Sequence, residues 1–177
     1  MDSCVLFTED EIRARVKNLG REVAQWAQSG GGSTKEDVCM LWLAEGAFVF
    51  AADLARAIDC GIRVRSVRAS SYANAFKSSG TVSVNADFSE YKNMRVLVVD
   101  DIFDTGRTLA EISRRLLKEG AAEIKTCVML KKNTREKRNF PPPDFFGFEI
   151  PDEYVFGYGL DAAEKFRNLP DIRFYKD

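Results

Sequence analysis

Acidic and hydroxyl side chains gather in one short segment, Asp100–Thr108, directly after the apolar run Val96–Val99. A capping-box pattern, Thr108 followed by Glu111, predicts that a helix begins where this segment ends. A helix N-terminus presents unpaired N–H groups and the positive end of the helix dipole, and both favour a phosphate. Gly106 lets the backbone come close to such an anion. We therefore expect the turn that ends at Thr108 to hold a phosphate group.

Two acids at the end of the predicted strand suit another part of the same ligand. Asp100 and Asp101 are placed to accept hydrogen bonds from sugar hydroxyls or to hold a divalent cation. In an open α/β sheet, ligands lie outside the carboxyl ends of the strands. A phosphate cradle beside hydroxyl-binding acids suits a ribose 5-phosphate. The alternative is a generic α/β loop whose acids are merely solvated. However, a strand, the acid pair, the third acid Asp104, a Thr-Gly turn and a capped helix follow one another along the chain, and this succession favours a binding site.

Composition limits both the chemistry and the partners. The 177 residues include 26 basic and 27 acidic side chains, so the net charge of −1 gives no global reason to expect a nucleic-acid or anionic-membrane partner. The chain contains no histidine, which excludes histidine triads and histidine metal sites. Acid–base chemistry is left to carboxylates, lysines, tyrosines or the substrate.

Targeting and redox features point to the cytoplasm. The N-terminus lacks the basic start and apolar stretch of a secretory signal. The longest apolar run, Val38–Ala44, is too short to cross a bilayer, so no membrane partner is expected. The four cysteines are scattered without a Cys-x-x-Cys pair, which favours free thiols in a reducing compartment.

The order of predicted elements indicates one α/β domain covering residues 1–177. A capping box at Thr8 and Glu11 precedes apolar residues at helical spacing, and the continuous run Val38–Leu43 is typical of a strand buried on both faces. The predicted helices cover residues 9–28, 47–58 and 108–119, with a helical turn at 161–167. The predicted strands cover residues 38–43, 62–68, 81–84, 96–99, 124–130 and 154–158. Strands alternating with helices predict a mainly parallel central sheet flanked by helices.

The segments between these elements are predicted to be loops. Residues 69–80 are small and polar and form a long loop, and residues 131–140 form a basic loop that three prolines follow. Phe48 and Phe50, inside the second predicted helix, are assigned to core packing.

At the level of motifs, residues 96–109 (VLVVDDIFDTGRTL) resemble the phosphoribosyl-pyrophosphate-binding motif of the type I phosphoribosyltransferases. Further stretches are similar to the hypoxanthine (hypoxanthine-guanine) phosphoribosyltransferases, in that family's order: residues 45–54, 68–72, 147–152, 157–161 and 167–170. The resemblance implies the type I phosphoribosyltransferase fold, with a small hood formed by the termini and a flexible active-site loop. It also implies a homodimer or homotetramer.

The resemblance assigns a role to each candidate residue. Asp104 is the general base near the purine nitrogen, and Mg²⁺ is the cofactor. Binding of phosphoribosyl pyrophosphate falls to Asp100, Asp101, Asp104, Thr105, Gly106, Arg107 and Thr108. The residues that contact the purine are Lys132, Tyr154 and Val155. The residues of the pyrophosphate site and the closing loop are Glu45, Gly46, Ser71, Tyr72 and Arg167. The metal site comprises Asp100, Asp101 and Asp161.

The implied reaction is transfer of the phosphoribosyl group to a 6-oxopurine, hypoxanthine and also guanine, with release of pyrophosphate. A lysine suits a 6-oxo group because its ammonium only donates hydrogen bonds. Alternatives are an enzyme that prefers xanthine or a pyrimidine, and a non-catalytic ligand-sensing regulator with the same fold. Lys131 remains an alternative to Lys132. Glu45 departs from the Lys-Gly or Asn-Gly usual in the family, which puts pyrophosphate affinity in question.

Overall fold

The computed structural model describes residues 2–29, 38–71, 82–84, 86–134 and 140–176. The helices are α1 (Glu9–Ser29), α2 (Phe48–Ala57) and α3 (Arg107–Lys118), with a short 3-10 helix η2 (Ser89–Tyr91). The strands are β1 (Ser3–Phe7), β2 (Val38–Ala44), β3 (Arg63–Ser71), β4 (Val82–Val84), β5 (Arg95–Phe103), β6 (Glu123–Lys132), β7 (Phe145–Ile150), β8 (Val155–Phe156) and β9 (Ile172–Tyr175). Among the described helices, none has the length and apolar character needed to cross a bilayer.

Six strands form the main sheet, in the order β4-β3-β2-β5-β6-β7. The five from β3 to β7 run parallel, and β4 pairs antiparallel to β3. The predicted parallel sheet is therefore confirmed. The strands β2 and β5 are buried along most of their length, as their continuous apolar runs require.

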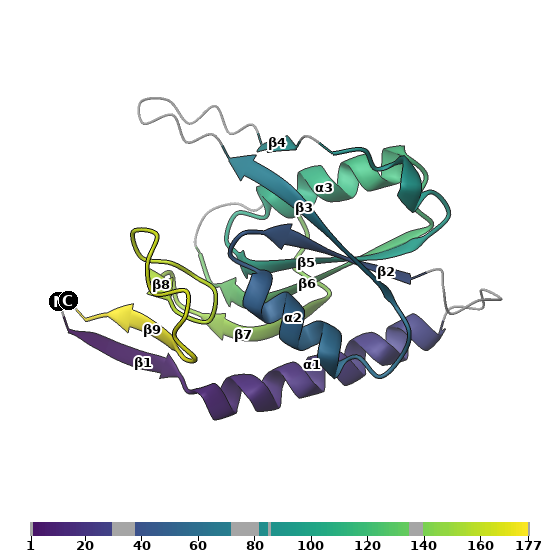
Figure 1. Ribbon diagram of the computed structural model, residues 1–177. Coiled ribbons are helices and arrows are strands. Elements are labelled where there is room, and N and C mark those ends of the chain that lie inside the picture. The colour runs from purple at the N-terminus through teal and green to yellow at the C-terminus, as the bar shows by residue number, and fades with distance from the viewer. Residues whose placement is uncertain (1, 30–37, 72–81, 85, 135–139, 177) are drawn as a thin grey trace.

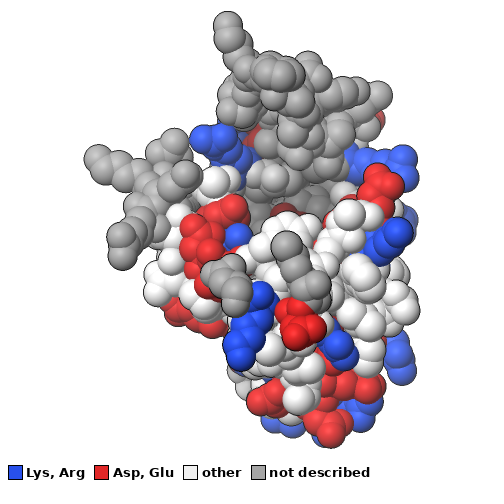
Figure 2. Space-filling view, turned by 90° about the vertical axis from the view of Figure 1, so that its left-hand side faces the viewer, with Lys and Arg blue, Asp and Glu red and all other residues white. Residues whose placement is uncertain are grey.

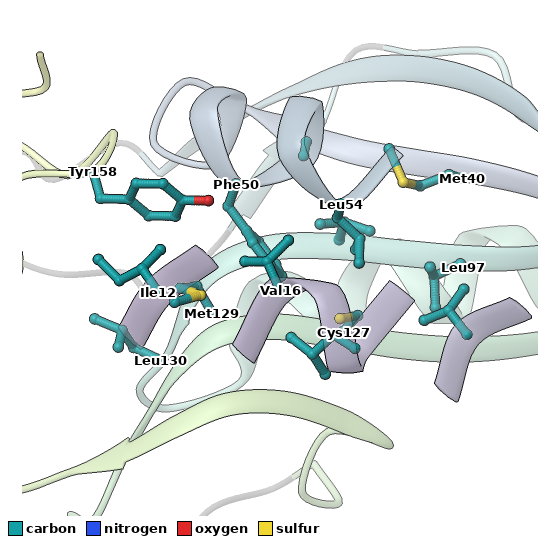
Figure 3. Close-up of a cluster of buried hydrophobic side chains, with 14 of the residues drawn as sticks. Ile12, Val16, Met40, Phe50, Leu54, Leu97, Cys127, Met129, Leu130 and Tyr158 are labelled. Carbon is teal, nitrogen blue, oxygen red and sulfur yellow. The ribbon is translucent and has the colours of Figure 1, made fainter. Parts of the chain in front are cut away.

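Helices cover both faces of this sheet (Figure 1). On one face, α1 and α2 bury Ile12, Val16, Phe50 and Leu54 against the strands, as Figure 3 shows. On the other face, Leu109, Ile112 and Leu116 of α3 enter a second apolar cluster. The capping box of α1 is confirmed, because the Thr8 N–H donates to Glu11 Oε2 at 2.8 Å and the Glu11 N–H donates to Thr8 Oγ1 at 3.4 Å.

The two ends of the chain form a second, three-stranded antiparallel sheet, β1-β9-β8. It lies at the side toward which the parallel strands point, with the termini next to each other (Figure 1). Phe7 stacks on Phe148 at 3.9 Å between ring centroids and so joins this sheet to β7. The predicted hood is confirmed, although its strands β1 and β9 were absent from the sequence prediction, as was β7.

Several local predictions are wrong. Helix α3 begins at Arg107 with Gly106 as its N-cap, and the Glu111 carboxylate accepts hydrogen bonds from Arg114 and Arg115 instead of closing a capping box with Thr108. The helix starts one residue earlier because Gly106 adopts φ 77° and turns the chain directly into it.

Three further segments differ from prediction in their backbone pairing. Residues 161–167 form no helical turn: they fold back on the preceding residues, with the Gly159 N–H donating to Arg167 O at 3.0 Å. Residues 69–71 belong to β3, where they pair with β4, and not to the predicted loop of 69–80, whose other residues lie outside the described part of the chain. The predicted strand 154–158 is reduced to Val155–Phe156.

The assignment of two phenylalanines to the core is half correct. Phe50 is buried, but Phe48 is 44% exposed because it lies in the first turn of α2 on the side away from the sheet.

Candidate active site

A cavity of about 290 Å³ opens at the carboxyl ends of β2 and β5. Its lining combines the acid pair, the following turn and the start of α3 with the end of β2. The lining residues are Leu43, Ala44, Gly46, Asp100, Asp101, Ile102, Phe103, Asp104, Thr105, Gly106, Arg107, Thr108 and Leu109. The structure therefore brings the whole predicted phosphoribosyl-binding segment together with Gly46, which lies far from it in the sequence.

The acid pair is held by the backbone of β5. The Asp101 N–H donates to Asp100 Oδ1 at 3.0 Å, and the Ile102 N–H donates to Asp101 Oδ1 at 2.7 Å. Removal from water and the neighbouring Asp101 carboxylate raise the pKa of Asp100 well above its ordinary value. Removal from water also raises the pKa of Asp101, although hydrogen bonds and the charge of Arg167 oppose this effect. A pair that resists carrying two bare negative charges is suited to a positively charged or hydroxyl-bearing ligand.

The turn after β5 forms the N-terminus of α3. Gly106 is required there, because a Cβ at this position would lie 2.7 Å from the Phe103 ring as well as demanding a left-handed backbone. Thr105 and Thr108 are partly buried beside the cavity, and Asp104 and Arg107 are exposed at its rim. The first N–H groups of a helix have no partner within it, so this end of α3 can receive an anion.

The turn between β2 and α2 closes the other side of the cavity. The Ala44–Glu45 peptide bond is cis, and Gly46 lies so close to Asp101 that a Cβ at position 46 would collide with the Asp101 carboxylate. The Glu45 side chain turns outward and pairs with Arg68 at 3.1 Å, and both side chains are largely exposed. Sequence reasoning missed Arg68 as a site residue because it lies in β3, whereas its partner Glu45 lies far away in the sequence, on the turn between β2 and α2.

The segment after β8 brings two more predicted residues to this region. Arg167 donates to Gly159 O at 2.8 Å and pairs with Asp161 at 2.9 Å, and its charge reaches Asp101. Tyr154, which is 58% exposed, donates its hydroxyl hydrogen bond to Asp161 O at 3.0 Å. Val155 is buried beneath it in β8.

The two lysines that end β6 take different partners. Lys131 Nζ lies 3.3 Å from Glu149 and 4.8 Å from the centroid of the Phe146 ring. Lys132 Nζ lies 3.3 Å from Asp152, two residues before Tyr154. Lys132 is therefore the lysine that lies against the stretch leading to Tyr154.

The predicted metal acids are not gathered in one cluster. Asp100 and Asp101 are adjacent, but Asp161 is paired with Arg167, and within the described residues no three acidic or thiol side chains form a ready-made cation site. Tyr72 lies outside the described residues, as does most of the predicted closing loop, and Ser71 is described only as the last residue of β3.

Charges of both signs surround this side of the molecule. Figure 2 views it from the direction toward which the parallel strands point, and blue and red residues alternate over the described surface without one dominant patch. This distribution agrees with the net charge of −1.

Comparison with known proteins decides the family. A phosphoribosyl transferase domain model matches residues 10–163. The hypoxanthine-guanine phosphoribosyltransferase of Aquifex aeolicus is 41% identical over 174 residues, which cover 98% of this chain and 94% of that protein. This chain belongs to the hypoxanthine phosphoribosyltransferase family.

Other members of the hypoxanthine phosphoribosyltransferase family are similar over nearly the whole chain. The hypoxanthine phosphoribosyltransferase of Escherichia coli K12 is 36% identical, covering 95% of this chain and 92% of that protein. The crystal structure of the Staphylococcus aureus hypoxanthine phosphoribosyltransferase superposes with a TM-score of 0.86 at 32% identity, covering 98% of this chain and 91% of that one. The type I phosphoribosyltransferase fold is thereby confirmed.

Proposed function

We propose that this chain transfers the 5-phosphoribosyl group of phosphoribosyl pyrophosphate to a nitrogen of hypoxanthine, and also of guanine, and releases pyrophosphate, as a step of purine salvage. The observation that carries the proposal is the cavity in which the acid pair of β5 faces the glycine-capped start of α3. In a member of the hypoxanthine phosphoribosyltransferase family, this arrangement is a ribose 5-phosphate site.

The chain's own residues hold the sugar phosphate from two sides. The turn Asp104–Thr108 receives the 5′-phosphate, because helix N–H groups, the dipole of α3 and two threonine hydroxyls converge there. Asp100 and Asp101 accept hydrogen bonds from the ribose hydroxyls. Positive charge develops on the ribose C1′ as pyrophosphate leaves, and the positions of these acids favour that charge.

Mg²⁺ fits the donor set of the acid pair. It is a hard cation that binds one or two carboxylates together with substrate phosphates. Burial raises the pKa of both Asp100 and Asp101, and a cation bound beside them would offset the cost of their buried charges. When bound, Mg²⁺ neutralises charge on the leaving pyrophosphate. Asp161 pairs with Arg167 at 2.9 Å, so it can bind Mg²⁺ only with its other carboxylate oxygen or after this ion pair breaks.

The purine and the leaving group lie on the hood side. Lys132 donates to the 6-oxo group, Tyr154 stacks on the base and Val155 contributes backbone contacts, while Asp104 takes the proton from the purine nitrogen. Glu45, Gly46 and Arg167 flank the pyrophosphate. The role that the family resemblance implies for Ser71 and Tyr72, exclusion of water from the site, falls at the end of β3 and beyond the described residues. The Arg68 partner of Glu45 reduces the repulsion that a glutamate would otherwise exert on pyrophosphate.

A substrate panel tests the proposal directly. Purified protein, phosphoribosyl pyrophosphate and Mg²⁺ are incubated with hypoxanthine, guanine, xanthine, adenine or orotate, and the nucleotide products are separated. Hypoxanthine and guanine are expected to give the highest kcat/KM. An Asp101→Asn variant purified in parallel reports any activity carried over from the expression host. If no 6-oxopurine gives a nucleotide product, the proposal is contradicted. If xanthine or orotate gives the highest kcat/KM, the enzyme is a phosphoribosyltransferase with that substrate instead.

Assembly and location belong to the same proposal. We expect a homodimer or homotetramer, and the C-terminal region of the Trypanosoma cruzi relative has a described role in its oligomeric state and enzymatic activity. Sedimentation velocity measures the mass against the 19.9 kDa chain. A cytoplasmic location is supported by the buried free thiols Cys39 and Cys127, which suit a reducing compartment.

A further inference from the structure

Tyr158 makes a contact that joins the hood side of the site to α2. Its side chain is 7% exposed, and its hydroxyl donates a hydrogen bond to Asp53 Oδ2 at 2.9 Å. Figure 3 shows the hydroxyl pointing toward α2 at the edge of the core. The acceptor is a carboxylate, which makes this bond stronger than one between neutral groups.

The residues around Tyr158 belong to a compact segment, 157–169, whose chain folds back on itself. The Tyr158 N–H donates to Leu169 O at 2.9 Å, the Gly159 N–H donates to Arg167 O at 3.0 Å, and Arg167 returns a side-chain bond to Gly159 O at 2.8 Å. Asp161 is on the same segment and is paired with Arg167. Whatever holds Tyr158 therefore also holds Asp161 and Arg167.

The same segment rests directly on the turn between β2 and α2. A Cβ at Gly159 would lie 2.5 Å from Gly46 O, so the two backbones are in contact. The Asp53 side chain projects from α2, the helix that this turn opens, since the Phe48 N–H donates to Glu45 O at 3.3 Å. Tyr158 and Gly159 thus clamp the segment to α2 at one point and to the turn at another.

We propose that Tyr158 and Asp53 are a positioning pair, which fixes the segment carrying Asp161 and Arg167 against the Glu45–Gly46 turn and so sets the affinity for the pyrophosphate group. The inference rests on the proposed function and deepens it. Neither residue touches the reacting atoms. The purine side depends on Lys132, which lies at the end of β6 beside Asp152, so the effect is expected to fall mainly on one substrate.

Removing either partner is expected to weaken pyrophosphate-side binding selectively. Tyr158→Phe and Asp53→Ala each raise the KM for phosphoribosyl pyrophosphate roughly three- to tenfold, the range expected for loss of a hydrogen bond to a charged group. The KM for hypoxanthine changes by less than about twofold because that contact is separate. Asp53→Asn retains an acceptor oxygen but loses the charge, so its KM for phosphoribosyl pyrophosphate is expected to lie between those of the wild type and Asp53→Ala. The double variant Tyr158→Phe/Asp53→Ala is expected to be no weaker than either single variant.

Arg56→Ala is the matched control. Arg56 lies 3.6 Å from the other carboxylate oxygen of Asp53 and its side chain is 84% exposed, so its loss leaves the tyrosine bond in place. Its kinetics are expected to equal those of the wild type. Thermal melts of all variants verify that they are folded, and hydrogen exchange is expected to show reduced protection at residues 44–48 and 157–169 in Tyr158→Phe.

Calorimetry with magnesium pyrophosphate alone separates this inference from the proposed function. The Kd for pyrophosphate is expected to rise in Tyr158→Phe by the same factor as the KM, whether or not a purine is turned over. An inactive wild type with this Kd shift contradicts the proposed function but not the pair. Three results would overturn the proposal that Tyr158 and Asp53 are a positioning pair. They are equal changes in the KM of both substrates, additive effects in the double variant, and a lowered melting temperature with an unchanged Kd for pyrophosphate.

Discussion

At the scale of single residues, Asp104 combines exposure with a place at the rim of the cavity. Its neighbours Asp100 and Asp101 lie deeper in the cavity, at the end of β5, and accept hydrogen bonds from backbone N–H groups. Asp104 is therefore the acid of the three that is free to approach a base bound above the sugar, as the role of a proton acceptor requires.

Replacement of Asp104 by asparagine should separate binding from chemistry. Asp104→Asn keeps the size and polarity of the side chain but cannot accept the purine proton, so kcat is expected to fall by roughly 10²- to 10⁴-fold. Calorimetry should show that phosphoribosyl pyrophosphate still binds. A variant with unchanged turnover would exclude Asp104 as the base.

The two lysines of β6 make a matched pair of variants. Lys132→Ala removes a donor beside the Asp152–Tyr154 stretch, and we expect the hypoxanthine KM to rise roughly tenfold or more. Lys131 is held by Glu149 and the Phe146 ring, so Lys131→Ala should leave that KM unchanged. Steady-state kinetics decide between them, and the reverse result would assign the purine contact to Lys131.

At the scale of elements, helix α3 has two roles: its N-terminus lines the candidate phosphate site, and its apolar face packs on the sheet. Its buried face, Leu109, Ile112 and Leu116, fixes its axis against the sheet and thereby aims its N-terminus into the cavity. On its outer face, Glu111 accepts hydrogen bonds from Arg114 and Arg115. These bonds strengthen the helix without contacting the cavity side of its first turn.

This arrangement predicts an acid-sensitive contribution to stability. Hydrogen bonds from Arg114, then from Arg115, lower the pKa of Glu111 from 4.5 to about 2. Because the folded-state pKa is depressed, the stabilisation is present above pH 4.5 and is lost as pH falls through about 2. We expect about 1 kcal/mol from it after solvent screening.

Denaturant unfolding measures this contribution. Between pH 4.5 and about 2, Glu111→Gln should lose less free energy of unfolding than the wild type, by the amount that the carboxylate contributes. Parallel curves for the two proteins would show that the interaction adds nothing to stability.

At the scale of the whole molecule, stability and function occupy opposite ends of the sheet. The cavity lies at the carboxyl ends of β2 and β5, whereas Arg95 begins β5 at the other end. There Arg95 pairs with Glu123 at 2.7 Å, donates to Trp26 O at 2.9 Å and stacks over the Trp26 ring at 4.5 Å. This cluster ties the end of α1 to β5 and β6.

Breaking this cluster should cost stability and spare catalysis. The Arg95 side chain is only 15% exposed, and Arg95→Ala removes its pair with Glu123, its hydrogen bonds to the end of α1 and its stacking over Trp26. The variant is expected to lower the free energy of unfolding by about 2–3 kcal/mol. The KM values for both substrates should stay at the wild-type level. A change in KM as large as the change in stability would mean that the two ends of the sheet are coupled.

The sequence alone determined the features that are local in the chain. The buried strands β2, β5 and β6, the acid pair, the Thr-Gly turn and the presence of a helix after it could be predicted because hydrophobic period and turn chemistry act over a few residues. The residue at which that helix begins could not, because Gly106 and not Thr108 is its N-cap. The segment Asp100–Thr108 lines one cavity, and the ligand roles of its residues stay predictions.

Only the tertiary structure decided how distant segments meet. The hood strands are short, and the N-terminal strand β1 pairs with the C-terminal β9, so no local pattern reveals that pairing. The contact of Gly46 with Asp101, the bond from Tyr158 to Asp53 and the separate partners of Lys131 and Lys132 likewise join residues far apart in sequence. Such contacts are set by packing and the sheet's register, which a single sequence does not display.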